Sequence, residues 1–281
     1  MTLQEVLISG KQKLMAADIA DAATDAWLLL AMVCKIDRNY FYAHLQEELG
    51  EEQHADYRIA VEKRAEHIPL QYITGEQEFM GCVIKVNSGV LIPRMETEIL
   101  VTEALKDLTP GMSVLDLCTG SGCIMISLMK HLDGLKGYAS DISKQALKLA
   151  KENAKLNETA IIFQQGDLFA RATEQFDMII SNPPYIPTAD LQDLMTEVRD
   201  FEPHVALDGG ADGYDFYRRI IKEAPGYLKE GGYLYMETGY NQGDLVAGMM
   251  RAAGFVQVVV IKDLQGLDRV VRGKLQEEKD V

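Results

Sequence analysis

The chain has 281 residues and a mass of 31.3 kDa, and its 47% apolar and 25% charged residues are typical of a globular protein with ample core material. Its net charge of −15, with no basic run longer than Lys63-Arg64 or Arg218-Arg219, argues against a surface built to bind nucleic acid. None of the four cysteines has zinc-ligand spacing, so we expect no metal, and we expect reduced thiols as in a cytoplasmic protein.

The N-terminal quarter of the sequence predicts helices only. Its first residues lack the basic segment and apolar core of a signal peptide, and no apolar stretch of the chain reaches membrane-spanning length. Apolar side chains fall at helical spacing through residues 2–75. We interpret residues 1–75 as a small helical domain that recognises the substrate. Residues 76–93 are expected to form a linker, in which two β-prone runs around Asn87-Ser88-Gly89 predict a β-hairpin.

The remainder, residues 94–281, alternates between strand and helix patterns. A helix opens after Pro93, and Arg94 and Glu96 are interpreted as solvated charges at its start. Strands are expected at 114–117, 137–140, 161–165, 176–181, 233–237, 256–261 and 269–272, with helices between most of them. This order predicts an α/β, Rossmann-like domain with a mostly parallel seven-stranded sheet. Residues 186–212 carry few signals, and we interpret them as a lid, a substrate loop or a surface excursion.

A glycine-rich loop follows the first strand and opens a helix, an arrangement that lets a nucleotide-like ligand approach the backbone. Its residues are Cys118, Thr119, Gly120, Ser121 and Gly122. The third glycine of the dinucleotide fingerprint would fall at Met125, and no Gly-Lys-Ser/Thr is present, so a pyrophosphate site and a P-loop are both disfavoured. Asp141 ends the second strand, where a carboxylate can bind ribose hydroxyls. Asp167 follows the third strand and can accept a hydrogen from an adenine amine.

A second motif, Asn182-Pro183-Pro184-Tyr185, follows the fourth strand, which the two prolines end abruptly. The Asn182 side-chain carbonyl and the Pro183 backbone carbonyl can each accept one hydrogen of a planar NH2 group, and the Tyr185 ring can lie against that group. An ordinary strand-ending turn is the alternative for this motif alone. Because the glycine-rich loop belongs to the same sheet, we favour an amine clamp beside a ligand with adenine and ribose but no phosphate, which is S-adenosyl-L-methionine.

Several motifs resemble those of known enzymes. Residues 115–122, 166–169 and 181–186 resemble the class I S-adenosylmethionine-dependent methyltransferases of amino nitrogen. Residues 69–75, 90–98, 202–210 and 268–270 are similar to the release factor glutamine methyltransferases, the PrmC/HemK family, so the likeness covers essentially the whole chain. The resemblance implies methylation of the side-chain amide nitrogen (N5) of the glutamine in the Gly-Gly-Gln motif of class 1 peptide chain release factors.

The resemblance also implies residue roles. The cofactor would contact the glycine-rich loop from Cys118 to Gly122 together with Asp141, Asp167, Leu168 and Asn182. The glutamine would lie against Asn182, Pro183, Pro184 and Tyr185, with Asn182, Pro183 and Tyr185 as catalytic residues. The sequence departs from the usual family pattern at Cys118, which replaces a glycine, and at Met95, which replaces a proline.

Two alternatives remain at this level. The same clamp fits an exocyclic base amine, so N6-adenine methylation of DNA or RNA is the alternative activity. The charge of −15 and the lack of a basic target-recognition region argue against it. The other alternative is a catalytically silent scaffold that binds the cofactor, against which the intact Asn182 and Asp141 argue.

Overall fold

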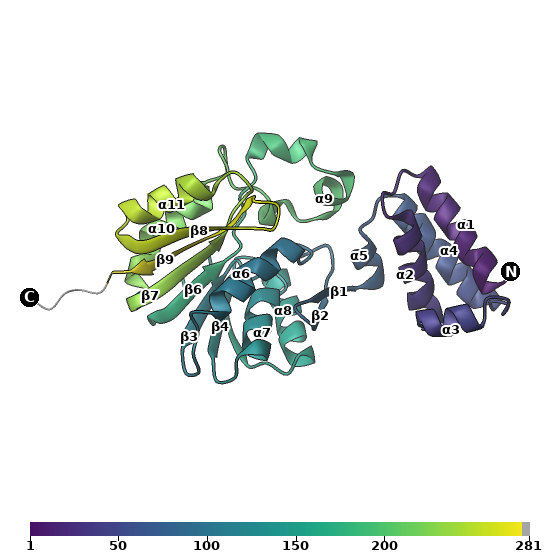
Figure 1. The fold of residues 1–281 in the computed structure, drawn as a ribbon, viewed down its shortest axis with the longest axis horizontal. Helices are drawn as coiled ribbons and strands as arrows, with labels where there is room; N and C mark the ends of the chain where they lie inside the picture. The colour runs from purple at the N-terminus through teal and green to yellow at the C-terminus, as the bar shows by residue number, and fades with distance from the viewer. Residues whose placement is uncertain (277–281) are drawn as a thin grey trace, which may run out of the picture. The chain divides into compact units, whose positions relative to one another are not determined.

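The computed structural model describes residues 1–276, which divide into two compact units (Figure 1). The N-terminal unit comprises Met1–Gly75 and Met195–Phe201, and the sheet unit comprises Glu76–Leu194 and the residues from Glu202 onward. The chain therefore passes from one unit to the other after residues 75, 194 and 201. No helix within residues 1–276 combines the length and the apolar character needed to cross a membrane.

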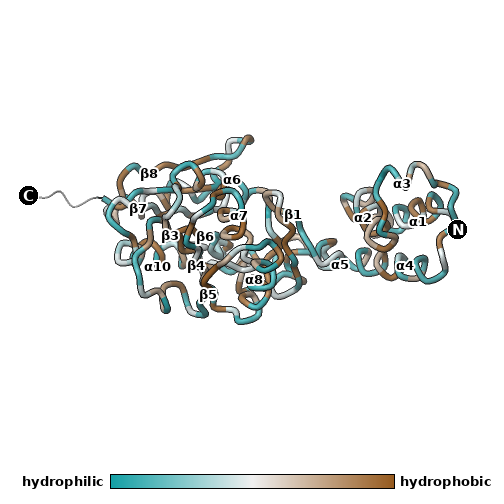
Figure 2. Tube along the Cα trace, turned by 90° about the horizontal axis from the view of Figure 1, so that it is seen from below, coloured by the Kyte–Doolittle hydropathy of each residue, from teal (hydrophilic) through white to brown (hydrophobic). Residues whose placement is uncertain are grey.

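The N-terminal unit is helical, as predicted. Its helices are α1 (Leu3–Ala16), α2 (Ala22–Cys34), α3 (Arg38–Ala43), α4 (Glu51–Ala65) and α5 (Leu70–Thr74). A capping box between Thr2 and Glu5 starts α1, because each side chain accepts from the other residue's backbone N–H. The core is formed by apolar faces of α1, α2 and α4, and the hydropathy-coloured trace shows the apolar character of α2 (Figure 2).

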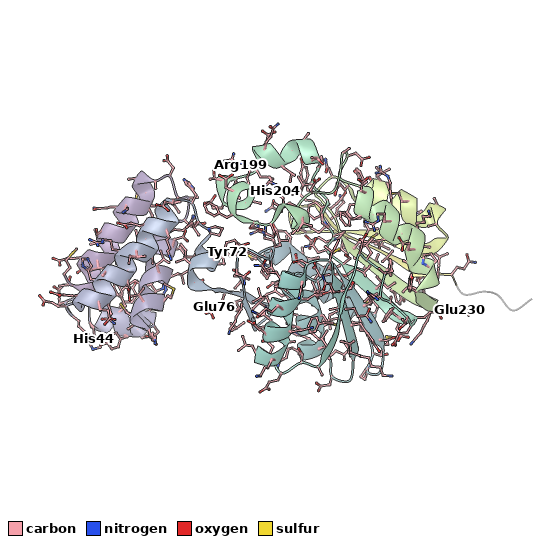
Figure 3. The ribbon with its side chains drawn as sticks, turned by 180° about the vertical axis from the view of Figure 1, so that it is seen from behind. His44, Tyr72, Glu76, Arg199, His204 and Glu230 are labelled. Carbon is pink, nitrogen blue, oxygen red and sulfur yellow. The ribbon has the colours of Figure 1, made fainter. Side chains whose placement is uncertain are left out.

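A short helix far along the sequence belongs to this unit. The stretch 186–212 contains the 3₁₀ turns η1 (Thr188–Asp193) and η2 (His204–Ala206) and, between them, helix α9 (Thr196–Phe201). Figure 3 marks Arg199 on α9 and His204 on η2. Arg64 of α4 is buried and donates to Asp25 of α2 (2.6 Å) and to Glu197 of α9 (2.9 Å). A partly buried ion pair between Arg64 and Glu197 therefore joins α9 to the helical bundle.

The sheet unit contains the predicted mostly parallel seven-stranded sheet. Its strands are β3 (Ser113–Leu117), β4 (Lys136–Asp141), β5 (Ile161–Gln165), β6 (Phe176–Ser181), β7 (Leu228–Glu237), β8 (Phe255–Lys262) and β9 (Asp268–Leu275). The spatial order is β5-β4-β3-β6-β7-β9-β8, and only the pairings of β9 are antiparallel. Leu117 pairs with Ser140 on one side and with Ser181 on the other, so β3, β4 and β6 end at the same edge.

Helices cover both faces of this sheet. They are α6 (Met95–Leu105), α7 (Cys123–His131), α8 (Lys144–Leu156), α10 (Asp215–Glu223) and α11 (Gly243–Ala252). Leu234 and Met236 of β7 share a core with α10 and α11, whereas Tyr235 between them donates to Asp107 just after α6 (2.5 Å). Because neighbouring strand residues point to opposite faces, α6 and the α10–α11 pair lie on opposite sides.

The hairpin is present, but the predicted position of its turn is wrong. Strands β1 (Glu76–Phe79) and β2 (Cys82–Lys85) are joined at Met80-Gly81, not at Asn87-Ser88-Gly89. Both turn residues have positive φ, +50° and +73°, as a two-residue hairpin turn requires. Residues 90–92, which were expected to form the second strand, have no strand partner in the structure. The hairpin packs on α7 and α8 within the sheet unit.

Candidate active site

One pocket lies at the edge of the sheet where β3, β4, β5 and β6 end. It is lined by seven residues that the sequence singled out: Cys118, Gly120, Asp141, Asp167, Leu168, Asn182 and Pro184. The structure therefore brings residues from four strand ends together around one space. Thr119 and Ser121 of the glycine-rich loop are buried behind its surface. Neither of them, nor Gly122, Pro183 or Tyr185, is among the lining residues found within 1–276.

The glycine-rich loop has an unusual backbone. Cys118, Gly120 and Gly122 have φ values of +58°, +55° and +84°. At Gly120 no atom lies within 4 Å of the place where a side chain would begin, so the loop leaves open space there. At Gly122 a Cβ would come within 3.2 Å of the Ala150 side chain, so glycine allows the loop to pass close to α8. Cys118 adopts the left-handed conformation without being glycine, which costs free energy.

Two carboxylates lie beside this loop. Asp141 accepts hydrogen bonds from the backbone N–H of Gly120 (2.9 Å) and of Ser143 (2.8 Å). Burial raises the pKa of Asp141, while these backbone donors act in the opposite direction. Asp116 is fully buried in β3 and accepts from the Thr119 hydroxyl (2.5 Å), and burial raises its pKa to about 7. Its Oδ1 has no hydrogen-bond partner in the described part of the chain.

The sequence did not identify the other walls of the pocket. These walls come from residues 89–91 and from Ser140, Ile142, Ser143, Ala146, Pro203, Val205, Ala206, Phe216 and Arg219. Arg219 of α10 donates to Asp167 (2.7 Å), and its guanidinium lies 5.8 Å from the centre of the Phe216 ring. Residues 90–91 and 203–206 lie inside the motifs 90–98 and 202–210 that supported the family resemblance, and those motifs could have identified them as pocket residues. For Arg219 there was none.

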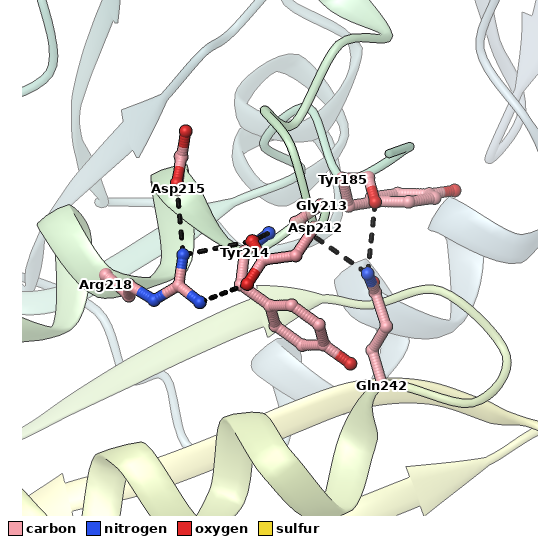
Figure 4. A network of polar contacts seen from close by, with 7 residues as sticks. All are labelled: Tyr185, Asp212, Gly213, Tyr214, Asp215, Arg218 and Gln242. Carbon is pink, nitrogen blue, oxygen red and sulfur yellow. Dashed lines mark hydrogen bonds and ion pairs between the residues drawn. The ribbon is translucent and has the colours of Figure 1, made fainter. Parts of the chain in front are cut away.

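The Asn-Pro-Pro-Tyr motif is held from two sides. The Asn182 side-chain NH2 donates to the hydroxyl of Thr97 in α6 (3.2 Å). At the other end, the Tyr185 backbone carbonyl accepts from the Gln242 side chain (3.0 Å), as Figure 4 shows. Gln242 is itself buried and accepts from the Gly239 backbone N–H (2.9 Å) and the Tyr217 hydroxyl (3.3 Å). The motif is therefore fixed by side chains on α6 and at the start of α11.

Arg94 is not the solvated helix-start charge that the sequence suggested. It forms an ion pair with Glu202, whose side chain is almost completely buried. Burial raises the pKa of Glu202, and the Arg94 guanidinium acts in the opposite direction. The two residues are 108 positions apart, so no local pattern could reveal the pairing. The pair joins the start of α6 to the segment that supplies Pro203, Val205 and Ala206 to the pocket wall.

The seven-stranded sheet, the strand-end pocket and the Asn-Pro-Pro-Tyr motif together are those of a Rossmann-like methyltransferase. Comparison with known families agrees, since residues 5–75 match the PrmC N-terminal domain and residues 95–198 match the methyltransferase small domain. A methyltransferase structure from Pyrococcus furiosus shares the fold, with a TM-score of 0.54 and 18% identity, over 70% of this chain and 90% of that chain.

Curated relatives identify the family. The release factor glutamine methyltransferase of Geobacter sulfurreducens is 42% identical over 98% of this chain and 97% of its own length. The enzyme of the same name from Cereibacter sphaeroides is 41% identical over 98% of this chain and 99% of its own. The chain belongs to the release factor glutamine methyltransferase family.

Proposed function

We propose that the protein transfers the methyl group of S-adenosyl-L-methionine to the side-chain amide nitrogen (N5) of the glutamine in the Gly-Gly-Gln motif of class 1 peptide chain release factors. The products are N5-methylglutamine and S-adenosylhomocysteine. The observation that carries the proposal is the position of Asn182, which lines the strand-end pocket and begins the amine-acceptor motif. The full-length relatives that bear the name of this activity support the choice of substrate.

The residues around the pocket fit this cofactor. Asp141 would bind the ribose hydroxyls, and Asp167 with Leu168 would receive the adenine. Cys118 and the open space at Gly120 would accommodate the methionine part. When bound, the cofactor supplies an electrophilic methyl group on a positively charged sulfur.

The protein's own task is to make an amide nitrogen reactive. That nitrogen is a poor nucleophile because its lone pair is conjugated with the neighbouring carbonyl. The Asn182 side-chain oxygen and the Pro183 carbonyl accept the two hydrogens of the glutamine NH2, and they stabilise positive charge that develops there as the N–CH3 bond forms and the S–CH3 bond breaks. The Tyr185 ring holds the amide plane and excludes water. The proton lost from nitrogen passes to solvent.

Release factors are therefore the proposed partners, and we infer that the helical N-terminal unit contributes to their recognition. N6-adenine methylation is the less favoured activity, because a chain of net charge −15 opposes a polyanionic substrate. The four cysteines are free thiols, which supports a cytoplasmic location.

Asn182→Ala tests this proposal. We expect the change to lower methyl transfer by at least about 100-fold, because it removes one of two acceptors aimed at developing charge. Cofactor affinity, measured by calorimetry, should remain measurable, since Asp141 and the glycine-rich loop are untouched. Asn157→Ala is the matched control, because Asn157 caps α8 and is not a lining residue. Wild-type turnover in Asn182→Ala would refute the mechanism.

A further inference from the structure

A buried acidic residue lies directly behind the amine-acceptor motif. Glu237 is the last residue of β7 and is only 2% exposed. Ser181, the last residue of β6, pairs with Met236 of β7, so Asn182, which follows β6, and Glu237 lie at the same level of the sheet. Thr97, also 2% exposed, reaches the same place from the first turn of α6. Burying a carboxylate costs free energy unless it is hydrogen-bonded or paired, so a buried Glu237 suggests a specific role at this position.

The polar contacts of these three side chains have one consistent direction. The Asn182 NH2 donates to the Thr97 oxygen (3.2 Å), which leaves the hydroxyl hydrogen of Thr97 free for another acceptor. Hydrogen bonding from the side chains of Thr97 and Asn182 lowers the pKa of the Glu237 carboxyl, so both side chains face it, while Glu237 Oε2 has no hydrogen-bond partner within the described residues. An ionised carboxylate can only accept, so both neighbours must present hydrogens to it.

This direction matters because the two ends of an asparagine amide have nearly the same shape. If the amide were rotated by half a turn, its NH2 would face the substrate NH2, and no acceptor would remain there. With Glu237 ionised, that rotation would turn the Asn182 oxygen toward a carboxylate and leave the buried carboxylate and the Thr97 oxygen without the NH2 donor. Glu237 is not among the pocket-lining residues found within 1–276, so it acts on the site from behind.

We propose that Glu237, together with Thr97, is a positioning residue that fixes the orientation of the Asn182 amide and so presents the amide oxygen to the substrate NH2. The proposal rests on the proposed function for its catalytic consequence, but the orientation itself is a property of the free protein.

The charge state of Glu237 gives the arrangement a dependence on pH. Burial raises the pKa of Glu237 to about 7, with the Thr97 and Asn182 hydrogen bonds acting in the opposite direction. Further charges act from other elements: Glu96 of α6 raises this pKa and Arg269 of β9 lowers it. The other titratable groups that interact with Glu237 are Tyr185, Tyr217 of α10 and Cys123 of α7. Below about pH 7 the protonated carboxyl can donate, and it no longer enforces one orientation of Asn182.

The catalytic test uses three variants of the full chain with release factor as substrate. Thr97→Val keeps the shape and removes the hydroxyl, Thr97→Ser keeps the hydroxyl, and Glu237→Gln removes the charge. We expect Thr97→Val and Glu237→Gln to lower kcat by about 10- to 100-fold, the value of one or two hydrogen bonds to a charged group. Cofactor affinity should stay within about twofold, since neither Thr97 nor Glu237 is itself a lining residue within 1–276 and Asp141 and the glycine-rich loop are unchanged. Thr97→Ser should recover most of the activity, and the fall in kcat below about pH 7 should disappear in Glu237→Gln.

Two results would overturn the proposal: wild-type kcat in Glu237→Gln, or a loss in Thr97→Ser as large as that in Thr97→Val, which would indicate packing. A second measurement needs no substrate and separates this inference from the proposed function. In the free protein, the side-chain NH2 of Asn182 should exchange its hydrogens slowly by NMR, and Glu237→Gln should accelerate that exchange by about tenfold or more. Equal exchange in the two proteins would refute the orientation, whatever the substrate proves to be.

Discussion

The buried ion pair of the N-terminal unit gives the prediction that can be worked out most fully. Arg64 donates to Asp25 at 2.6 Å and to Glu197 at 2.9 Å, and the side chains of Arg64 and Asp25 are only 9% and 8% exposed. Arg64→Met keeps the aliphatic stem and removes the guanidinium. Asp25 is then a buried carboxylate without its cation, a loss that typically costs about 3–5 kcal/mol. The contact to Glu197 adds less, because that side chain is 26% exposed.

The assay follows from the composition of the chain. Trp27 is the only tryptophan, it lies in α2, and it is nearly buried, so its fluorescence reports unfolding of the N-terminal unit. In urea we expect Arg64→Met to lower the free energy of unfolding by about 3–5 kcal/mol. Hydrogen exchange of residues 195–201 should accelerate in the same variant, since α9 loses its ion pair.

The control is the double variant Asp25→Leu/Arg64→Met. Replacing both charges by apolar groups removes the buried carboxylate, so most of the lost stability should return, to within about 1–2 kcal/mol of the wild type. The reasoning would be refuted if Arg64→Met alone stayed within about 1 kcal/mol of the wild type, or if the double variant were no more stable than the single one.

Three further predictions concern the sheet unit. The pKa of Glu237 is raised from 4.5 to about 7, so the stability that this carboxyl contributes is present below pH 4.5 and is lost as the pH rises through 7. Glu237→Gln should therefore raise the free energy of unfolding in denaturant by up to roughly 3 kcal/mol at about pH 8 and leave it unchanged at about pH 4. A gain that is independent of pH would contradict this. Cys118 has a φ of +58°, a conformation that glycine adopts easily and a β-branched residue does not. In thermal unfolding, the stability of Cys118→Gly should stay within about 1 kcal/mol of the wild type, while Cys118→Val should lose about 2 kcal/mol. Equal losses in the two variants would be evidence against backbone strain. Asp141→Asn offers only one acceptor to the two N–H groups of Gly120 and Ser143, so calorimetry should find S-adenosyl-L-methionine binding weakened by at least about tenfold, and an unchanged affinity would exclude the role assigned to this carboxylate.

The elements of the sheet unit were largely predictable because their signals are local. Strands β5 and β6 have the bounds that the sequence suggested, since each apolar run is closed by glycine, proline or polar residues. Parallel strands end at one edge, and that rule alone brought Asp141, Asp167 and Asn182 to one pocket. The prediction of the hairpin turn was wrong because Asn-Ser-Gly and Met-Gly both contain residues that favour a turn, and the structure uses the two-residue Met-Gly connection.

The remaining features depend on pairs of residues that are far apart in the sequence. Arg94 pairs with Glu202, and Arg64 pairs with Glu197, which is 133 positions away. Both pairs result from tertiary packing, which the periodicity of the sequence does not predict. Helix α9 has six residues and no buried ones, so it lacked the apolar pattern that reveals a helix. Thr97 of α6 and Glu237 of β7 likewise lie behind Asn182 only because of the tertiary packing of these two elements. The sequence therefore predicted residues that line the pocket better than the residues that hold them in place.

The most direct test is methyl transfer from labelled S-adenosyl-L-methionine to three acceptors: a purified class 1 release factor, the same factor with the glutamine of its Gly-Gly-Gln motif changed to alanine, and duplex DNA. We expect label on the intact factor and on neither of the others. Label on DNA would contradict the assigned substrate while leaving the amine clamp intact. No label on any acceptor, with cofactor binding preserved, would contradict the proposed transfer to release factors.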